Sequence, residues 1–172
     1  MRSSVRVRKA IGRADILLAA TQVDQKAIER IHGRKSALLS VVGTNPLVST
    51  AAKDFHTGNR PLRVAWCGTF VSRKALPIAL RAIQRAARKI PVQLDIVGSG
   101  ECEQLWKSVA KKLGNSSLFI WHGSVPHDHA MEIIRRSDVM LFTSLQEATA
   151  TVVVESLQFG VPVICHDLCG FG

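Results

Sequence analysis

Five short apolar runs alternate with longer amphipathic stretches in the chain after residue 61. Each run is too apolar to leave one face in water, which is typical of parallel strands covered on both faces. Strands separated by helical stretches predict a parallel α/β sheet with crossover helices. The predicted strands are residues 62–67, 92–97, 118–121, 139–143 and 161–165.

Apolar residues recur at helical spacing between these runs, which predicts three amphipathic helices. Pro77 falls in the first turn of the first helix, where its missing N–H costs nothing. Gly114 is suited to cap the second, and Arg135 and Arg136 suit the C-terminus of the third. The three stripes are Leu76, Leu80, Ile83, Ala87 and Ile90; then Leu105, Val109 and Leu113; then Ala130, Ile133 and Ile134.

The first 61 residues have a different organisation. Residues 15–20 and 36–42 are predicted strands, and the helix between them is expected to begin at Thr21, with Asp24 in the capping position, and to end at Gly33. Residues 43–61 have the turn formers of a linker. One helix and two strands cannot bury a core alone. We therefore predict the tail of a separate domain over 1–50, a linker over 51–61 and the main domain over 62–172.

Composition narrows the class of protein. With 172 residues and 47% hydrophobic content, the chain can bury a core and disorder is not expected. No apolar stretch approaches the roughly 20 residues that cross a bilayer, and no signal peptide is recognisable, which predicts a cytoplasmic protein. The four cysteines are expected to be reduced. Cys165, His166, Asp167 and Cys169 lack a second matching pair, so no metal site is predicted.

Positive charge is concentrated at the front of the chain. Residues 1–61 carry a net +7 of the total +10. This segment permits peripheral contact with an anionic membrane, at its inner face, or non-specific contact with nucleic acid. A solvated helical face is the favoured interpretation, because no aromatic residues are interleaved, and no specific nucleic-acid partner is expected. The basic residues concerned are Arg2, Arg6, Arg8, Lys9 and Arg13.

Ligands of an open parallel sheet lie beyond the carboxyl ends of its strands. Glycines follow three of the predicted strands there, at Gly68, Gly98 and Gly123, and would permit close approach of the backbone to a ligand. The loop from Gly98 to Gly100 lacks the full G-x-G-x-x-G, so a dinucleotide cofactor is not expected. His122, His127 and His129 are interpreted as loop residues rather than ligands.

Charged residues at two strand exits suggest a phosphate and a sugar. Arg73 and Lys74 stand at the predicted start of the first helix, where cations and free N–H groups favour a phosphate, although an exposed basic pair has the same appearance. Glu147 and Glu155 are separated by seven uncharged residues, and a carboxylate can accept two sugar hydroxyls. Propensity favours a strand between them. A helix beginning near Ala150 would instead direct free N–H groups toward the strand exits.

This ordered series resembles the retaining GT-B glycosyltransferases of glycosyltransferase family 4, whose nucleotide-binding domain carries an E-x7-E motif. The resemblance spans most of 62–172, and residues 14–42 are similar to the end of the family's first domain. It implies a helix rather than a strand after Glu147. The matching segments are residues 68–74, 94–100, 123–125, 137–144, Glu147 to Glu155, and 160–163.

The resemblance implies a fold and a function. The fold would be a Rossmann-like sheet with helices on both faces, the truncated C-terminal half of a GT-B fold, preceded by a fragment of the N-terminal acceptor domain. The chain would bind a nucleotide-diphosphate sugar and, in the complete protein, transfer the sugar to a saccharide or lipid-linked acceptor with retention. No metal and no organic cofactor are implied.

The resemblance also assigns roles to residues. Arg73 and Lys74 would bind the donor diphosphate and stabilise the leaving group, and Glu147 would hold hydroxyls of the donor sugar. Glu155 would hold the ribose hydroxyls. The remaining donor contacts would be Gly68, Thr69, Gly98, Gly100, Val125, Ala150 and Thr151.

Two departures keep an alternative open. The family has glycine where Ala148, Thr149 and Ala150 stand, and its lysine–glycine pair is Lys74–Ala75 in this chain. A non-catalytic nucleotide-binding module, or pseudo-enzyme, is therefore the second hypothesis. The fragment alone is expected to bind without transferring, because catalysis needs both substrates held together.

Overall fold

The main body of the chain is built on a five-stranded parallel sheet with the strand order β5-β4-β3-β6-β7. The computed structural model describes residues 4–39, 58, 60–147 and 150–167. This architecture confirms the predicted fold class. The strands are β3 (Leu62–Cys67), β4 (Val92–Val97), β5 (Phe119–Gly123), β6 (Val139–Phe142) and β7 (Val163–Cys165).

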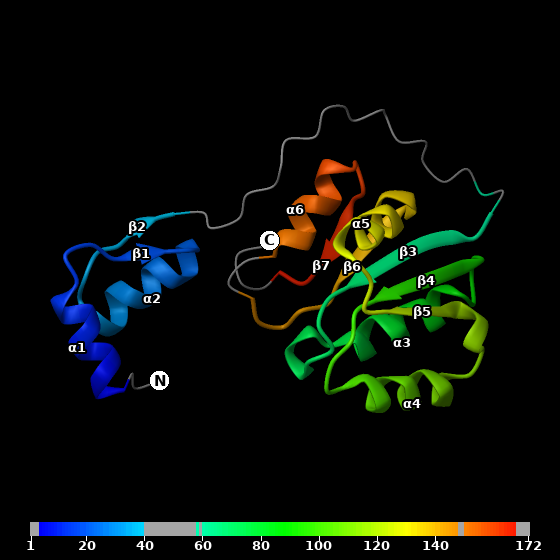
Figure 1. Ribbon diagram of the computed structural model, residues 1–172, viewed down its shortest axis with the longest axis horizontal. Coiled ribbons are helices and arrows are strands. Elements are labelled where there is room, and N and C mark those ends of the chain that lie inside the picture. The colour runs from blue at the N-terminus through cyan, green and yellow to red at the C-terminus, as the bar shows by residue number, and fades with distance from the viewer. Residues whose placement is uncertain (1–3, 40–57, 59, 148–149, 168–172) are drawn as a thin grey trace.

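Helices cover both faces of this sheet. Figure 1 shows α3 (Leu76–Ala86) and α4 (Glu103–Leu113) on one face, and α5 (His127–Arg136) and α6 (Thr151–Gln158) on the other. Two 3-10 turns, η1 (Ser72–Lys74) and η2 (Ser116–Leu118), precede α3 and β5. The larger buried cluster lies under α3 and α4, and a smaller one lies under α5 and α6.

The strand order places a crevice beside β3. The chain runs from β3 to β4 and β5 on one side and then returns to β6 on the other. At such a switch point the following loops turn away in opposite directions, and the carboxyl ends of the two central strands are left open to a ligand. The loops after β3 and β6 are those that carry Arg73, Lys74 and Glu147.

The predicted strand boundaries hold for the two strands in which buried and partly buried side chains fill almost the whole run. β3 and β4 have the predicted bounds. β5 begins one residue late, because Leu118 ends the turn η2, and it continues to Gly123. β6 ends before Thr143. β7 begins only at Val163, since Pro162 has no N–H to donate to a ladder.

The predicted stripe of α4 is wrong by one residue at its start. Leu105 is 62% exposed, whereas Trp106 is 3% exposed and belongs to the core. The Trp106 ring packs edge-on against Trp66, with centroids 6.0 Å apart, and lies 5.3 Å from the ring of Phe70. Such aromatic contacts outweigh burial of a leucine at the neighbouring position. Similarly, Ile90 lies beyond the end of α3 and is exposed.

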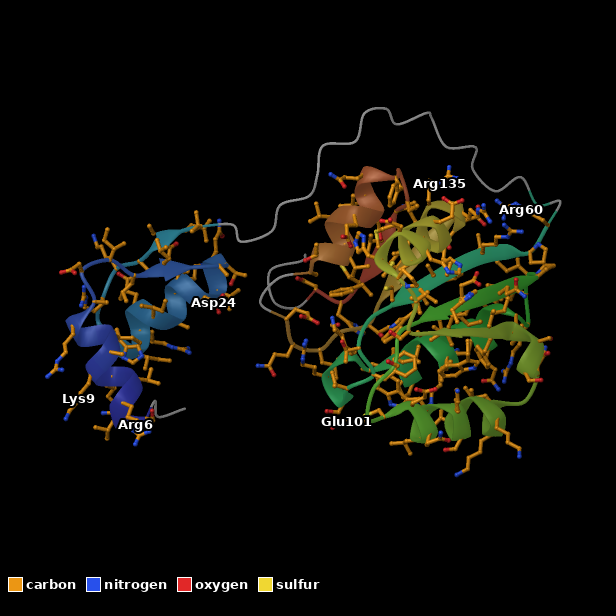
Figure 2. The ribbon with its side chains drawn as sticks, in the orientation of Figure 1. Arg6, Lys9, Asp24, Arg60, Glu101 and Arg135 are labelled. Carbon is orange, nitrogen blue, oxygen red and sulfur yellow. The ribbon has the colours of Figure 1, made fainter. Side chains whose placement is uncertain are left out.

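The buried carboxylate of Asp138, just before β6, is hydrogen-bonded to residues at the start of β3. Asp138 accepts hydrogen bonds from both Nη atoms of Arg60, at 2.6 and 2.7 Å, and from the backbone N–H of Arg63 at 2.8 Å. Arg60 stands just before β3, at the amino-terminal end of this central strand, where Figure 2 labels it. The contact therefore joins the starts of the two central strands, at the end of the sheet opposite the crevice.

The first segment contains α1 (Val5–Arg13), β1 (Leu18–Ala19), α2 (Gln22–His32) and β2 (Ala37–Leu38). The predicted caps of α2 are confirmed: Thr21 Oγ1 accepts a hydrogen bond from Asp24 N–H, and Gly33 is left-handed with φ 62°. Both strands are shorter than predicted, because β1 and β2 pair over only two positions. Residues 40–42 and most of the predicted linker lie outside the described residues.

This segment has almost no core of its own. Neither α1 nor α2 contains a buried residue, and Ala19 is the one buried hydrophobic residue described before β3. Arg6 and Lys9 project from α1 in Figure 2. In the described ranges, no helix combines the length and hydropathy needed to cross a bilayer. The domain division, the membrane contact and the cytoplasmic location stay predictions.

Candidate functional site at the strand ends

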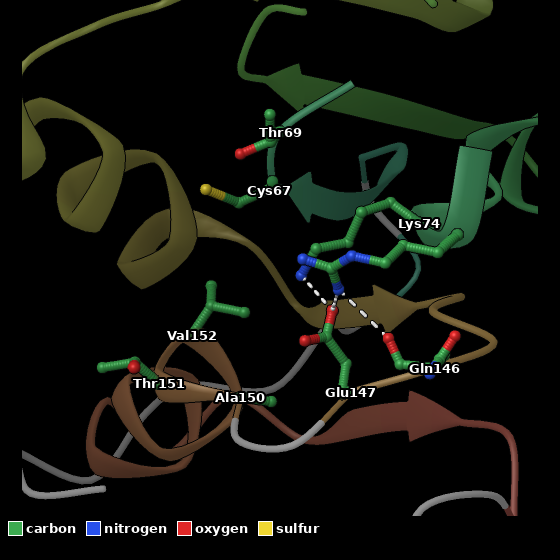
Figure 3. Close-up of a pocket in the computed structure, with 10 residues that line it drawn as sticks. Cys67, Thr69, Lys74, Gln146, Glu147, Ala150, Thr151 and Val152 are labelled. Carbon is green, nitrogen blue, oxygen red and sulfur yellow. Dashed lines mark hydrogen bonds and ion pairs between the residues drawn. The ribbon is translucent and has the colours of Figure 1, made fainter. Parts of the chain in front are cut away.

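A pocket of about 690 Å³ opens at the carboxyl ends of β3 and β6. Its walls are the loop after β3, the cationic turn η1, the loop after β6 and the first turn of α6. The lining residues are Cys67, Gly68, Thr69, Arg73, Lys74, Gln146, Glu147, Ala150, Thr151 and Val152. Figure 3 shows the labelled side chains of these segments around one space.

An ion-pair cluster crosses this pocket. Arg73 Nη1 donates to Glu147 Oε1 at 2.6 Å and to the backbone oxygen of Gln146 at 3.0 Å. The Lys74 ammonium forms a second ion pair with the same carboxylate oxygen. In Figure 3, Lys74 and Glu147 point toward each other. Two cations and one carboxylate leave one net positive charge in the cluster, which suits an anionic ligand.

The Glu147 carboxyl is held in its ionised form. Burial is the largest single influence on its pKa and opposes ionisation. Hydrogen bonds from Lys74 and Ser144, together with the charges of Lys74 and Arg73, outweigh burial and lower the pKa. The carboxylate is therefore available as an acceptor for hydroxyl groups at neutral pH.

We expect Glu147→Gln to lower the free energy of unfolding at neutral pH by about 1 kcal/mol. The folded-state pKa of Glu147 lies below its usual 4.5, so the ion pairs contribute fully above that value and are lost as the pH falls through the lowered pKa. Urea denaturation of both chains from about pH 7 down to about pH 3 measures this loss. Glu101→Gln, which removes an exposed acid, is the control. A difference that persists unchanged at the acid end contradicts the prediction.

The two cations lie in a turn before the helix, which corrects the prediction that they begin it. Arg73 and Lys74 belong to η1, and α3 begins at Leu76. Ala75 separates the two elements with φ 48°, a left-handed conformation that glycine adopts at lower cost. This conformation gives a physical reason for the glycine that the resembling family has after its lysine.

The helix predicted after Glu147 is confirmed. α6 begins at Thr151 with Ala150 as its N-cap, although propensity favours a strand. Ala150, Thr151 and Val152 line the pocket, so the first turn of α6 faces the cations of η1. The first N–H groups of a helix lack intrahelical acceptors and attract negative charge. Ala148 and Thr149 lie outside the described residues.

An adjoining pocket of about 460 Å³ contains Glu155, Val125 and Gly98. It shares Cys67, Gly68, Thr69 and Val152 with the first pocket. The cations, Glu147 and Glu155 thus face neighbouring parts of one cleft. The four charged side chains selected from the sequence therefore line one cleft.

A histidine that the sequence analysis set aside contacts this second pocket. His127 Nε2 lies 2.9 Å from Glu155 Oε1, and this hydrogen bond is the main cause that raises the His127 pKa. The interpretation of the three histidines as loop residues is wrong: His122 belongs to β5, where it lies 2.7 Å from Asp95, and His127 and His129 belong to α5. Pro126 just before His127 is a helix-start signal that could have indicated this.

Sequence comparison places the chain in a family. The profile of the family described as "Glycosyl transferases group 1" matches residues 51–172. The chain belongs to this family.

Individual relatives are distant. A Bacillus subtilis protein provisionally named a teichuronic acid biosynthesis glycosyltransferase is 24% identical over 173 residues, covering 95% of this chain and 41% of that protein. A pneumococcal O-GlcNAc transferase, solved with UDP and GlcNAc, has a TM-score of 0.74 and 17% identity over 95% of this chain and 32% of its own. An Anabaena protein solved with UDP and glucose has a TM-score of 0.74 and 18% identity, with 96% and 48% covered.

The chain therefore spans less than half the length of each of these three proteins. The structural similarity establishes the fold: a GT-B glycosyltransferase domain in which a parallel sheet is flanked by helices on both faces.

Two glycines of this group 1 domain are explained by packing within the chain. A Cβ atom on Gly98 would stand 1.9 Å from the backbone oxygen of Gly68, and one on Gly100 would stand 2.8 Å from that of Phe70. Gly98 lines the second pocket, whereas Gly100 lines neither. The roles of both in donor binding stay predictions.

Cys67 lies between the two pockets of the cleft. Burial, with a smaller contribution from the Glu155 charge, raises the pKa of its thiol to about 11, although Lys74 acts in the opposite direction. The thiol is therefore protonated at neutral pH and is a poor nucleophile. Among the described residues, no group of three His, Cys, Asp or Glu side chains could hold a metal ion, and Cys169 lies outside them.

Proposed function

We propose that this domain binds a nucleotide-diphosphate sugar in the cleft between η1 and α6. We propose further that the complete protein, a retaining enzyme of glycosyltransferase family 4, transfers the sugar to a saccharide or lipid-linked acceptor. One observation carries the proposal: Arg73, Lys74 and Glu147, from two separate loops, converge on a pocket that is closed on another side by the first turn of a helix.

The cations are placed to act on the leaving group. When a glycosidic bond to a nucleoside diphosphate breaks, negative charge builds on the diphosphate. Arg73 and Lys74, together with the N–H groups of Thr151 and Val152, would interact more strongly with that charge than with the intact donor. Interactions that strengthen in this way lower the barrier, whereas unchanged ones only improve binding.

Each of the two carboxylates would bind a different part of the donor. Glu147, ionised beside the diphosphate-binding turn, would hold hydroxyls of the donor sugar. Glu155 lies in the adjoining pocket with Val125, and would hold the ribose diol while Val125 approaches the base. A carboxylate suits either role because its two oxygens accept several hydrogen bonds. The UDP named in two similar solved structures makes UDP the first ligand to test.

Calorimetric titration with UDP and with GDP tests the proposal. We expect the wild-type chain to bind at least one of them, and Arg73→Ala and Glu155→Ala to weaken that binding by about 1–3 kcal/mol each. Arg81→Ala is the matched control, because Arg81 is an exposed arginine of α3 outside the cleft. Absence of binding, or equal affinities in all variants, contradicts the site assignment. Binding by a complete protein that transfers no sugar would leave the module hypothesis instead.

A further inference from the structure

A buried hydroxyl joins the cationic turn to the centre of the sheet. Thr143 Oγ1 donates a hydrogen bond to the backbone oxygen of Lys74 at 2.9 Å and accepts one from the Trp66 indole N–H at 2.9 Å. Thr143 is 7% exposed and Trp66 is 2% exposed, so water does not replace either bond. The chain of bonds runs from β3, through the residue after β6, to η1.

The direction of each bond is determined by chemistry. An indole N–H can only donate, so Thr143 must accept from Trp66. Its hydroxyl hydrogen is then directed to the Lys74 carbonyl, which can only accept. A valine at this position would have nearly the same shape and would break both bonds, whereas a serine would keep the hydroxyl.

Neighbouring residues of the same strand end hold the rest of the cationic turn. The backbone N–H of Leu145 donates to the Arg73 oxygen at 2.8 Å. The Phe142 ring lies 5.4 Å from the Lys74 ammonium, and Ser144 hydrogen-bonds to Glu147. The positions of the turn and of its acidic partner are therefore both set by residues at the end of β6 and just after it.

We infer that Thr143 is a positioning residue for the diphosphate-binding turn. Its hydroxyl holds the Lys74 backbone at the end of β6, and the bond that it donates to the Lys74 carbonyl does not require the bond that it accepts from Trp66. The inference rests on the proposed function, since the turn is taken to bind a diphosphate. Thr143 lines neither pocket, so it acts on a ligand only through Lys74.

The expected effect is selective for the diphosphate. Without its anchor the Lys74 carbonyl is free to shift, and contacts to the outer phosphate weaken more than those to the nucleoside. Thr143→Val should lower the affinity for UDP about tenfold and that for UMP less than about threefold, and Thr143→Ser should restore UDP binding to within about threefold of wild type.

Trp66→Phe is a control for general loss of stability. It removes a buried donor and core volume but leaves the Thr143 bond to Lys74 available. We expect this variant to unfold more easily and yet to bind UDP within about threefold of wild type. The indole N–H resonance of Trp66, followed by NMR, should move in Thr143→Val and return in Thr143→Ser, which reports the bond directly.

The outcomes separate the two proposals. Normal UDP binding by wild type that is weakened by Arg73→Ala but unchanged by Thr143→Val overturns this inference and leaves the proposed function standing. Failure of Thr143→Ser to restore binding, or an equal loss in Trp66→Phe, likewise overturns it. A wild-type chain that binds neither UDP nor GDP overturns both.

Discussion

Replacing Lys74 with glutamate is expected to abolish measurable binding of nucleoside diphosphates, a loss of more than about a hundredfold. The Lys74 side chain is 13% exposed and its partner Glu147 is 7% exposed. The reversal would change the cluster from one net positive charge to one net negative charge. Two carboxylates would then lie together at the place where the diphosphate must bind, and like charges in a poorly hydrated site repel strongly.

Calorimetry with UDP measures this loss, and two further variants locate its cause. Lys112→Glu makes the same reversal on the exposed side of α4, outside the cleft, and should leave the affinity within about twofold of wild type. The double variant Lys74→Glu, Glu147→Lys restores the ion pair with its charges exchanged. It should recover more of the folding stability than of the affinity for UDP. Retention of UDP binding by Lys74→Glu would show that Lys74 does not contact the diphosphate.

Gly98→Ala is expected to lower the free energy of unfolding by about 3–5 kcal/mol. The position has φ 132°, which L side chains rarely adopt, and an added Cβ would stand 1.9 Å from the backbone oxygen of Gly68. Relief of the overlap requires separating the loops after β3 and β4, because the clashing atom is backbone and has no rotamer to change. UDP binding should be lost as well, since Gly68 lines both pockets.

Gly114→Ala separates the two parts of this cost. Gly114 also has a positive φ, of 70°, but, its chain neighbours apart, none of the described residues has an atom within 4 Å of the added Cβ. Its replacement should cost about 1–3 kcal/mol, the conformational part alone, because φ 70° with ψ 176° is a region that glycine almost alone adopts. Urea denaturation of the two variants gives the comparison. Equal losses at Gly98 and Gly114 would mean that contact with Gly68 does not require glycine.

The parts of the fold that could be predicted are those in which structure depends on residues close together in the sequence. β3 and β4 have their predicted bounds because both strands lie inside the sheet and, apart from the exposed Arg63, their side chains are buried or partly buried. The caps at Thr21 and Gly33 were predictable because capping depends on residues within one turn. Local patterns gave the wrong residue where a contact with a distant part of the chain determines burial. Trp106, and not Leu105, is buried because its ring packs against Trp66 and Phe70.

The charged residues of the candidate site could be selected from the sequence, but the contacts between them could not. Charge at the strand exits was enough to select Arg73, Lys74, Glu147 and Glu155. The helix that begins at Thr151 could be predicted only from the resemblance to a family, because residues 149–154 favour a strand by propensity. The contact of His127 with Glu155 could not be predicted, because the two residues are distant in sequence and come together only where α5 packs against α6.

The sequence by itself determined a parallel α/β sheet, the order of its elements and the acidic and basic residues at its carboxyl edge, because hydrophobic periodicity and charge are properties of the chain. Only the tertiary structure decided that Arg73 and Lys74 share one carboxylate, that Ala75 turns left-handed before α3, and that the Thr143 hydroxyl donates a hydrogen bond to the Lys74 backbone oxygen. These contacts join residues about 70 positions apart. Their geometry follows from how β3 and β6 pair, which no local pattern encodes.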